Sequence, residues 1–262
     1  MKKKNYFSLI CVIVFLIIYF TPLISIIVFS FNEAKSVTHF TNFSLIWYKD
    51  LFTNTRLLKI IFSTIIIAVV STIIATIIGT IVSICLTRSN KNVRNTILKI
   101  NNLPIINPDI VTGIGLLLLF VSLSIERSYF TMLIAHISFC TPYVTLNVYP
   151  KVKALDPNIF EAAEDLGAKP HKAMRDAILP QIKGSIISAA AISFTMSFDD
   201  FVISYFTGGS NLNISTYLYT EAKKINPTIN ALSTIIILVI AAKVIFDLIK
   251  ESKEEKNEKE NY

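Results

Sequence analysis

Long apolar stretches constrain this sequence more than any other feature. A helix that crosses the hydrocarbon core of a bilayer needs roughly 20 apolar residues, because it rises about 1.5 Å per residue through about 30 Å of lipid tails. Lipid offers the backbone no hydrogen-bond partner, so each span must be helical. The sequence therefore predicts an all-α membrane protein with about six transmembrane helices. The expected spans are residues 9–29, 58–86, 103–125, 130–149, 182–206 and 229–249.

The composition agrees with a membrane protein, since 53% of the 262 residues are hydrophobic and 16% are charged. The net charge of +7 does not indicate a nucleic-acid partner, because the basic residues lie in short clusters between the apolar stretches and form no basic face. Placing both termini in the cytoplasm puts most of these clusters inside, as the positive-inside tendency requires. The first stretch is too long for a signal peptide. Residues 251–262, a charged tail, are expected to have no structure.

A long polar segment, residues 151–181, separates the fourth and fifth expected spans and lies in the cytoplasm under this orientation. Asp156 is a good N-cap and Pro157 suits the first helical position, while Gly167 can adopt the left-handed conformation that ends a helix. The segment therefore predicts a helix of about ten residues. Pro170 can then start a second short helix.

The expected helix combines small apolar residues with an acidic ridge. Glu161 and Asp165 lie about one turn apart, beside the small side chains of Ala162 and Ala163. Such a face suits docking into a groove on another protein, although a surface helix that only packs beneath the bundle would show the same pattern. Further along, Pro180 is expected to interrupt the chain before the fifth span.

This segment also carries the most specific motif in the sequence. Glu161-Ala162-Ala163, followed by Gly167 and later by Pro180, resembles the cytoplasmic EAA loop of ABC importer permeases. In that family the loop forms a coupling helix that sits in a cleft of the ATPase subunit. The resemblance implies the fold of a type I importer permease. It assigns the coupling role to Glu161, Ala162, Ala163, Asp165, Gly167 and Pro180.

The similarity extends over nearly the whole chain. It includes PDIV at residues 108–111 and SFDD at residues 197–200, and it looks most like the spermidine/putrescine importer subgroup. The resemblance implies one permease subunit of an ATP-driven importer in the lipid of a bacterial cytoplasmic membrane. The implied partners are a homologous permease subunit, a cytoplasmic ATPase dimer and an extracytoplasmic solute-binding protein. Solute would pass by alternating access.

Signs of enzyme chemistry are absent from the sequence. No GxxxxGK[ST] phosphate loop occurs, so ATP and Mg²⁺ are expected on the separate ATPase subunit and no cofactor on this chain. His39, His136 and His171 are scattered and indicate no metal or nucleophile constellation. An intramembrane hydrolase built on Asp199 and Asp200 is disfavoured, because adjacent helix positions point about 100° apart. Two competing functions stay open: import of a different solute, such as a metal, an oxyanion or an amino-acid derivative, and a non-transporting scaffold.

The same two acids are candidate contacts for solute. Asp199 and Asp200 lie toward the outer end of the expected fifth span, where a carboxylate is costly in lipid. At least one is expected to line the solute pathway and to offset the dehydration of a polyamine's ammonium groups. It is equally consistent with the sequence that the pair caps the span. Tyr205 and Tyr143 could add aromatic faces for cations, or could only pack.

Prolines mark a candidate gate at the inner start of the third span. Pro104 and Pro108 interrupt the hydrogen-bond ladder of a helix, which permits bending. Asp109 follows them, where the positive end of a helix would favour a carboxylate. These three residues are therefore candidates for a hinge or gate.

Overall fold

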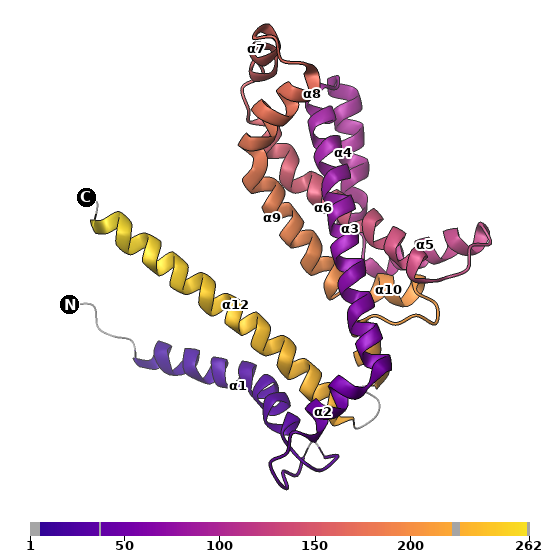
Figure 1. Ribbon diagram of the computed structural model, residues 1–262, viewed down its shortest axis with the longest axis vertical. Coiled ribbons are helices and arrows are strands. Elements are labelled where there is room, and N and C mark those ends of the chain that lie inside the picture. The colour runs from indigo at the N-terminus through magenta and orange to yellow at the C-terminus, as the bar shows by residue number, and fades with distance from the viewer. Residues whose placement is uncertain (1–5, 37, 222–225, 261–262) are drawn as a thin grey trace. The chain divides into compact units, whose positions relative to one another are not determined.

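The computed structural model describes residues 6–36, 38–221 and 226–260, and Figure 1 shows them as a set of helices. Within this part of the chain there is no β-strand, so the predicted all-α class is confirmed. The long helices are α1 (Tyr6–Ser30), α3 (Thr55–Arg88), α4 (Lys91–Ile106), α5 (Asp109–Ser122), α6 (Tyr129–Lys153), α9 (Leu179–Phe198) and α12 (Pro227–Glu260). The short ones are α2 (Ile46–Thr53), α7 (Ile159–Asp165), α8 (Pro170–Ala173), the π-helix η1 (Met174–Ile178), α10 (Val202–Thr207) and α11 (Ile214–Glu221).

Among the described residues, five helical segments are long and apolar enough to cross a membrane. The helices α4 and α5 would form a sixth span if they are counted together. They are bent by 105° relative to each other at the short break between them, so this span would be a broken one. The expected third span, residues 103–125, is therefore wrong as a continuous helix. Pro108 explains the break, since a proline disfavours helical backbone at the preceding residue, and Asn107 is extended with ψ of 143°. Pro104, by contrast, lies inside α4.

Two further boundaries differ from expectation. The expected fifth span, residues 182–206, is divided because α9 ends at Phe198 and α10 begins at Val202. Pro180 does not interrupt the chain, since α8, η1 and α9 follow one another directly. The π-helical turn precedes this proline, whose missing N–H could not make a regular helical hydrogen bond. Residues 251–260, expected to be unstructured, continue α12, because Glu and Lys are good helix formers; the last two residues lie outside the described part.

The chain forms two compact units, Met1–Leu58 with Leu218–Tyr262 and Lys59–Tyr217. In the first unit, α1 and α2 both pack against α12. The segment between α1 and α2 folds around Asn32, because Trp47 donates its indole N–H to the Asn32 carbonyl oxygen. The second unit contains the predicted coupling loop and both candidate acids.

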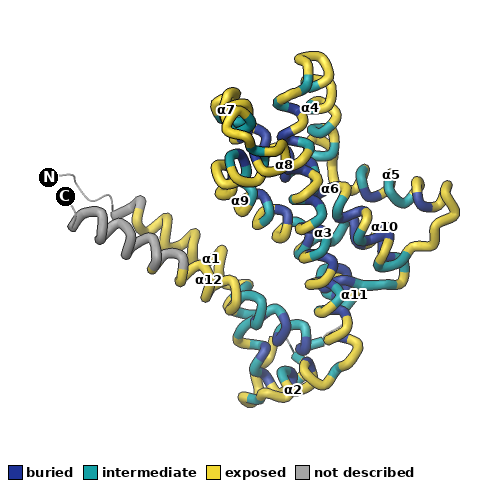
Figure 2. Tube along the Cα trace, turned by 45° about the horizontal axis from the view of Figure 1, so that its top comes forward, coloured by how far each residue is buried: buried dark blue, intermediate teal, exposed yellow. Residues whose placement is uncertain are grey.

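The core of the second unit is built around α6. This helix packs against α4, α9 and α10, and many of its residues are buried, which Figure 2 marks in dark blue along the trace. At Gly79 of α3, an added Cβ would lie 2.7 Å from the Cβ of Val144 on α6, so only glycine permits this approach. The outward faces of α3 and α5 expose large apolar side chains such as Ile77 and Leu118, as expected where helices face lipid or another membrane subunit.

Candidate functional site

The helix of the predicted coupling loop begins later than expected. It is α7, with 7 residues rather than about ten. Asp156 does not cap it; its carboxylate instead accepts a hydrogen bond from the backbone N–H of Asn158 at 2.9 Å. This bond turns the chain before the helix. Asn158 therefore occupies the cap position, and Pro157 lies outside α7.

The end of α7 matches the prediction for Gly167. This glycine has φ of +85°, and its N–H donates to the carbonyl oxygen of Glu164 at 2.8 Å. The N–H of Ala168 donates to the carbonyl oxygen of Ala163 at 3.1 Å. The two bonds form a Schellman motif, which requires a left-handed residue at this point. Pro180, the last member of the motif, lies in the first turn of α9.

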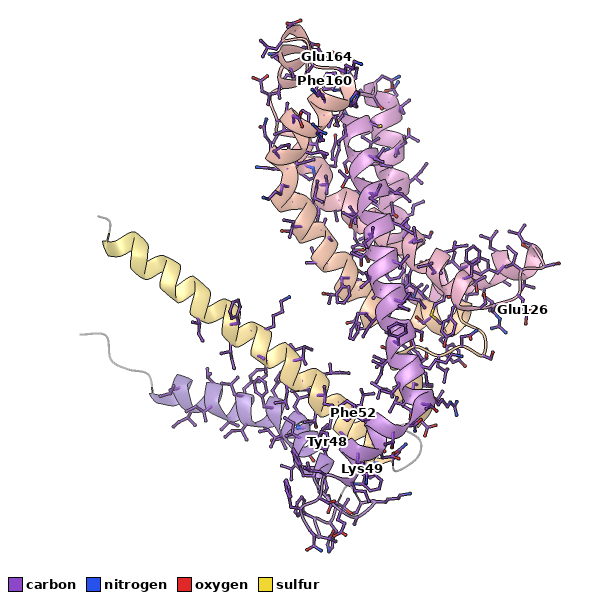
Figure 3. All side chains as sticks on the ribbon, viewed as in Figure 1. Tyr48, Lys49, Phe52, Glu126, Phe160 and Glu164 are labelled. Carbon is purple, nitrogen blue, oxygen red and sulfur yellow. The ribbon has the colours of Figure 1, made fainter. Side chains whose placement is uncertain are left out.

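One side of α7 is attached to the rest of the unit. Phe160 is half-buried, and the guanidinium carbon of Arg88 lies 3.7 Å from the centre of its ring, a cation–π contact with the end of α3. Ile159 and Phe160 also pack against the buried core. Figure 3 labels Phe160 and Glu164 at this end of the bundle.

The other side of α7 is open. The helix itself has no buried residue, and Leu166 directly after it is 90% exposed. Within α7 and directly after it, the exposed residues of the loop motif are Glu161, Ala162, Asp165 and Gly167. The structure thus presents a leucine beside acidic and small side chains, with the attachment on the opposite side.

The two adjacent acids occupy different environments. Asp199 is exposed at the end of α9. The side chain of Asp200 is only 9% exposed, and it accepts hydrogen bonds from the backbone N–H groups of Ile203 (3.2 Å) and Ser204 (2.7 Å). Asp200 thereby satisfies the free N–H groups at the start of α10.

A buried histidine completes this arrangement. His136 of α6 is 1% exposed, and its Nε2 lies 3.5 Å from the Asp200 carboxylate and 2.9 Å from Ser204 Oγ. Its Nδ1 lies 2.7 Å from Ser197 Oγ of α9, which in turn lies 2.9 Å from Ser71 Oγ of α3. We call this cluster the polar joint. Its members are Ser71, His136, Ser197, Asp200, Ser204 and Asn213.

The hydrogen-bond donors in the polar joint determine whether His136 Nε2 donates or accepts a hydrogen bond. Ser204 donates its hydroxyl proton to Asp200 at 2.8 Å, and Asn213 donates its amide to Ser204 Oγ at 2.7 Å. His136 Nε2 must therefore carry a proton and donate it toward Ser204 and Asp200. A serine hydrolase needs the opposite polarity, with the ring nitrogen accepting the serine proton. The joint is thus arranged to hold α3, α6, α9 and α10 together.

Sequence reasoning named Asp200 as a candidate but missed the cluster around it. His136 counted as one of three scattered histidines, and the serines carry no signal of their own. The signal that could have identified His136 is its position within an apolar span. An ionisable residue there usually faces the interior of the bundle and has a partner.

The aromatic candidates lie apart from the joint. Tyr143 is on α6, seven residues after His136, which corresponds to roughly 10 Å along the helix. Tyr205 is 51% exposed, and its ring centre lies 5.6 Å from that of Phe201. The structure therefore does not place Tyr143 in one site with His136 and Asp200.

The candidate gate lies at the bend between α4 and α5. Pro108 is the cap residue of α5 and Asp109 is its first residue. On one side of the bend, Asn101 of α4 donates its amide to the Pro142 carbonyl oxygen of α6 at 3.2 Å. On the other side, α5 packs against α10. The bend thus separates a segment held by α6 from one held by α10.

The fold defined by these helices is that of ABC importer permease subunits. A bacterial ABC transporter involved in the import of alginate matches with a TM-score of 0.66 at 16% identity, covering 95% of this chain and 94% of that chain. The MetNI methionine ABC transporter matches with a TM-score of 0.58 at 17% identity, covering 72% of this chain and 91% of that chain.

The chain belongs to the family of binding-protein-dependent transport system inner membrane components, which matches residues 75–254, and it is a multi-pass membrane protein. The putrescine transport system permease protein PotI of Escherichia coli K12 is 35% identical over 83% of this chain and 81% of its own length. The spermidine/putrescine permease protein PotC of Haemophilus influenzae is 32% identical over 86% and 89%. A PotC homolog of Mycoplasma genitalium is 31% identical over 90% and 86%. The resemblance noted from the EAA motif is confirmed.

Proposed function

We propose that this chain is one permease subunit of an ATP-driven importer that carries polyamines into the cytoplasm by alternating access. The cargo assignment rests on the similarity to proteins named for putrescine or spermidine/putrescine transport, at 31–35% identity. A homologous permease subunit would supply the other half of the pathway. A separate ATPase dimer would bind ATP and Mg²⁺, and an extracytoplasmic binding protein would deliver solute. Both termini and α7 would face the cytoplasm.

The geometry of α7 suits the transmission of ATPase closure. Its open side offers Leu166 and the acidic Glu161 to a partner, while Phe160 on the attached side contacts Arg88 of α3. The cap at Gly167 fixes where the helix ends. Moreover, α7 contacts η1, which continues directly into α9. A displacement of α7 would therefore reach two of the proposed spans.

Asp199 is the acid that we assign to the solute pathway. It is exposed, whereas Asp200 is engaged within the polar joint. Tyr205 is the exposed aromatic candidate on the following helix. A carboxylate and an aromatic ring face are the groups that attract ammonium ions. The bend at Pro108 and Asp109 would act as the hinge.

Uptake of labelled spermidine and putrescine tests the proposal, in cells that express this chain with its companion transport genes. Gly167→Pro should abolish uptake, because proline fixes φ near −65° where the structure has +85°. The matched control is Gly184→Ala, whose added Cβ meets no atom within 4 Å, and it should transport normally. Normal uptake by Gly167→Pro would overturn the coupling assignment. Accumulation that does not depend on this chain would overturn the cargo assignment.

A further inference from the structure

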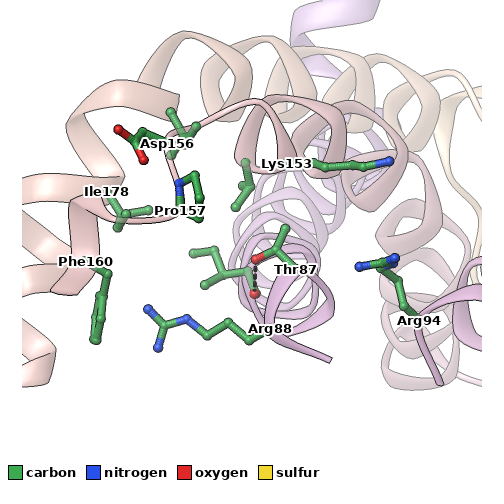
Figure 4. Close-up of a pocket in the computed structure, with 11 residues that line it drawn as sticks. Thr87, Arg88, Arg94, Lys153, Asp156, Pro157, Phe160 and Ile178 are labelled. Carbon is green, nitrogen blue, oxygen red and sulfur yellow. Dashed lines mark hydrogen bonds between the residues drawn. The ribbon is translucent and has the colours of Figure 1, made fainter. Parts of the chain in front are cut away.

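A cavity of about 250 Å³ lies where the ends of several helices meet the segment that leads into α7 (Figure 4). Arg88 is the last residue of α3, Arg94 lies in the first turn of α4, and Lys153 is the last residue of α6. All three line the cavity, together with Asp156 and Phe160. We call it the basic pocket.

The charges in the basic pocket are unbalanced. Three cations but a single carboxylate, that of Asp156, line it, and this carboxylate also accepts the backbone N–H of Asn158. No carboxylate among the described residues pairs with Arg88, Arg94 or Lys153 within 4.0 Å. In Figure 4 the charged ends of Arg94 and Lys153 lie on one side of the pocket and Asp156 lies on the other. That side therefore attracts an anion.

The walls of the pocket restrict the kind of anion. Ile84, Val152 and Ile178 contribute apolar surface that continues the cores of α3 and α6. The volume is below the roughly 300–1,000 Å³ of pockets that enclose a whole drug-sized ligand. The ligand must therefore place a small charged group in the pocket. The rest of the ligand must stay outside the pocket, against apolar helix surface. Exposed Ile77 and Ile81 on α3 provide such a surface.

We propose that the basic pocket binds the phosphate headgroup of an anionic phospholipid, with the acyl chains against the outer faces of the spans. The pocket lies at the ends of α3 and α6, the depth at which headgroups meet a spanning helix. Basic pockets between transmembrane helices on the cytoplasmic side suit such headgroups. The inference takes one point from the proposed function, namely that the pocket lies on the cytoplasmic side of the membrane.

The pocket also adjoins the coupling loop. Phe160, which lines it, belongs to α7 and holds the guanidinium of Arg88. A headgroup bound by Arg94 and Lys153 would leave that contact in place and would close the open space behind α7. Lipid in the pocket would thus support the attached side of α7 while the open side meets its partner.

Native mass spectrometry of the full-length chain in detergent tests the binding directly, with phosphatidylglycerol, phosphatidylcholine and inorganic phosphate as separate probes. We expect phosphatidylglycerol to bind, and the double variant Arg94→Gln/Lys153→Gln to weaken it by roughly fivefold for each charge removed. The matched control Lys99→Gln/Lys183→Gln removes two exposed cations that do not line the pocket, and it should bind normally. The charge-conserving Arg94→Lys/Lys153→Arg should retain most binding, which separates lost charge from lost folding.

Three results would overturn the inference. Equal losses in the pocket and control variants would mean that lipid binds any exposed cation. Phosphatidylcholine binding as tight as phosphatidylglycerol binding would remove the role of charge. Inorganic phosphate that displaces the lipid at equal concentration would assign the pocket to a free anion. None of these results depends on polyamine uptake, so the lipid site and the proposed function can fail separately.

Discussion

The polar joint and α7 belong to the same unit but differ in how completely this chain satisfies their side chains. In the joint, both ring nitrogens of His136 are bonded, and Asp200 accepts three hydrogen bonds in addition to its contact with the imidazole. In α7 no residue is buried, and Leu166 beside it is almost fully exposed. The joint is complete within this chain, whereas the open side of α7 lacks a partner.

This difference separates stability from coupling. Leaving one buried charged group without its partner is far more destabilising than changing an exposed residue. Changes in the joint should therefore lower the free energy of unfolding, and transport would fall as a consequence. Changes on the open side of α7 should leave unfolding unaltered and act only through the partner.

Asp200→Ala should give the largest effect. It leaves the backbone N–H groups of Ile203 and Ser204 without their acceptor and removes one of the two acceptors near His136 Nε2. Each buried polar group left unsatisfied in this way costs about 1–3 kcal/mol. The measurement is thermal or denaturant unfolding of the full-length chain in detergent. Asp199→Ala is the matched control one residue away; it removes an exposed carboxylate and should stay within about 0.5 kcal/mol. Equal losses for the two variants would contradict the distinction between these acids.

Gly79→Ala should give the next largest effect. The added Cβ would lie 2.7 Å from Val144 and 3.1 Å from the Thr141 carbonyl oxygen, so α3 and α6 must separate, at a cost of about 1–3 kcal/mol. Gly115→Ala in α5 is the control, because its Cβ meets nothing within 4 Å. That variant should be neutral or gain up to about 1 kcal/mol from the better helix propensity of alanine. The same unfolding assay compares them, and destabilisation by Gly115→Ala alone would contradict the packing.

Most of the correct predictions from the sequence followed from the residue types within short segments of the chain. The apolar stretches located the helices because lipid leaves the backbone no alternative. Gly167 was identified as the left-handed end of α7 from its residue type and position, since few other residues adopt that conformation. The family resemblance rested on the same short segment.

Tertiary contacts decided what could not be predicted. The division between α9 and α10 is stabilised by Asp200, which caps α10 and meets His136 from a helix more than sixty residues earlier. Neither residue signals the other along the chain. Similarly, Asp156 looks like a helix cap in the sequence, yet it bonds Asn158 and delays the helix. In both cases, Asp200 and Asp156, the sequence does not decide which of several possible groups the carboxylate binds.

Leu166→Ser should change function at constant stability. The side chain is 90% exposed, so unfolding should shift by less than about 0.5 kcal/mol. Binding of the ATPase partner should weaken about tenfold, as expected for an apolar residue at the centre of a small interface. Copurification of the ATPase at graded concentrations measures this, and Leu166→Met, which conserves volume, should bind normally. A fall in stability without a fall in binding would place Leu166 in the unit's own packing.

Asp176→Asn should give the smallest effect, although Asp176 lies closer to its basic partner than Asp200 lies to His136. Arg175 and Asp176 lie 2.6 Å apart, with side chains that are 68% and 56% exposed, whereas His136 and Asp200 lie 3.5 Å apart and are almost fully buried. Water screens the exposed pair and solvates either partner when the other is removed. We therefore expect no measurable shift in the unfolding midpoint for Asp176→Asn, and a large one for Asp200→Asn in the same assay. A shift for Asp176→Asn as large as that for Asp200→Asn would contradict burial as the property that decides how much each contact stabilises the unit.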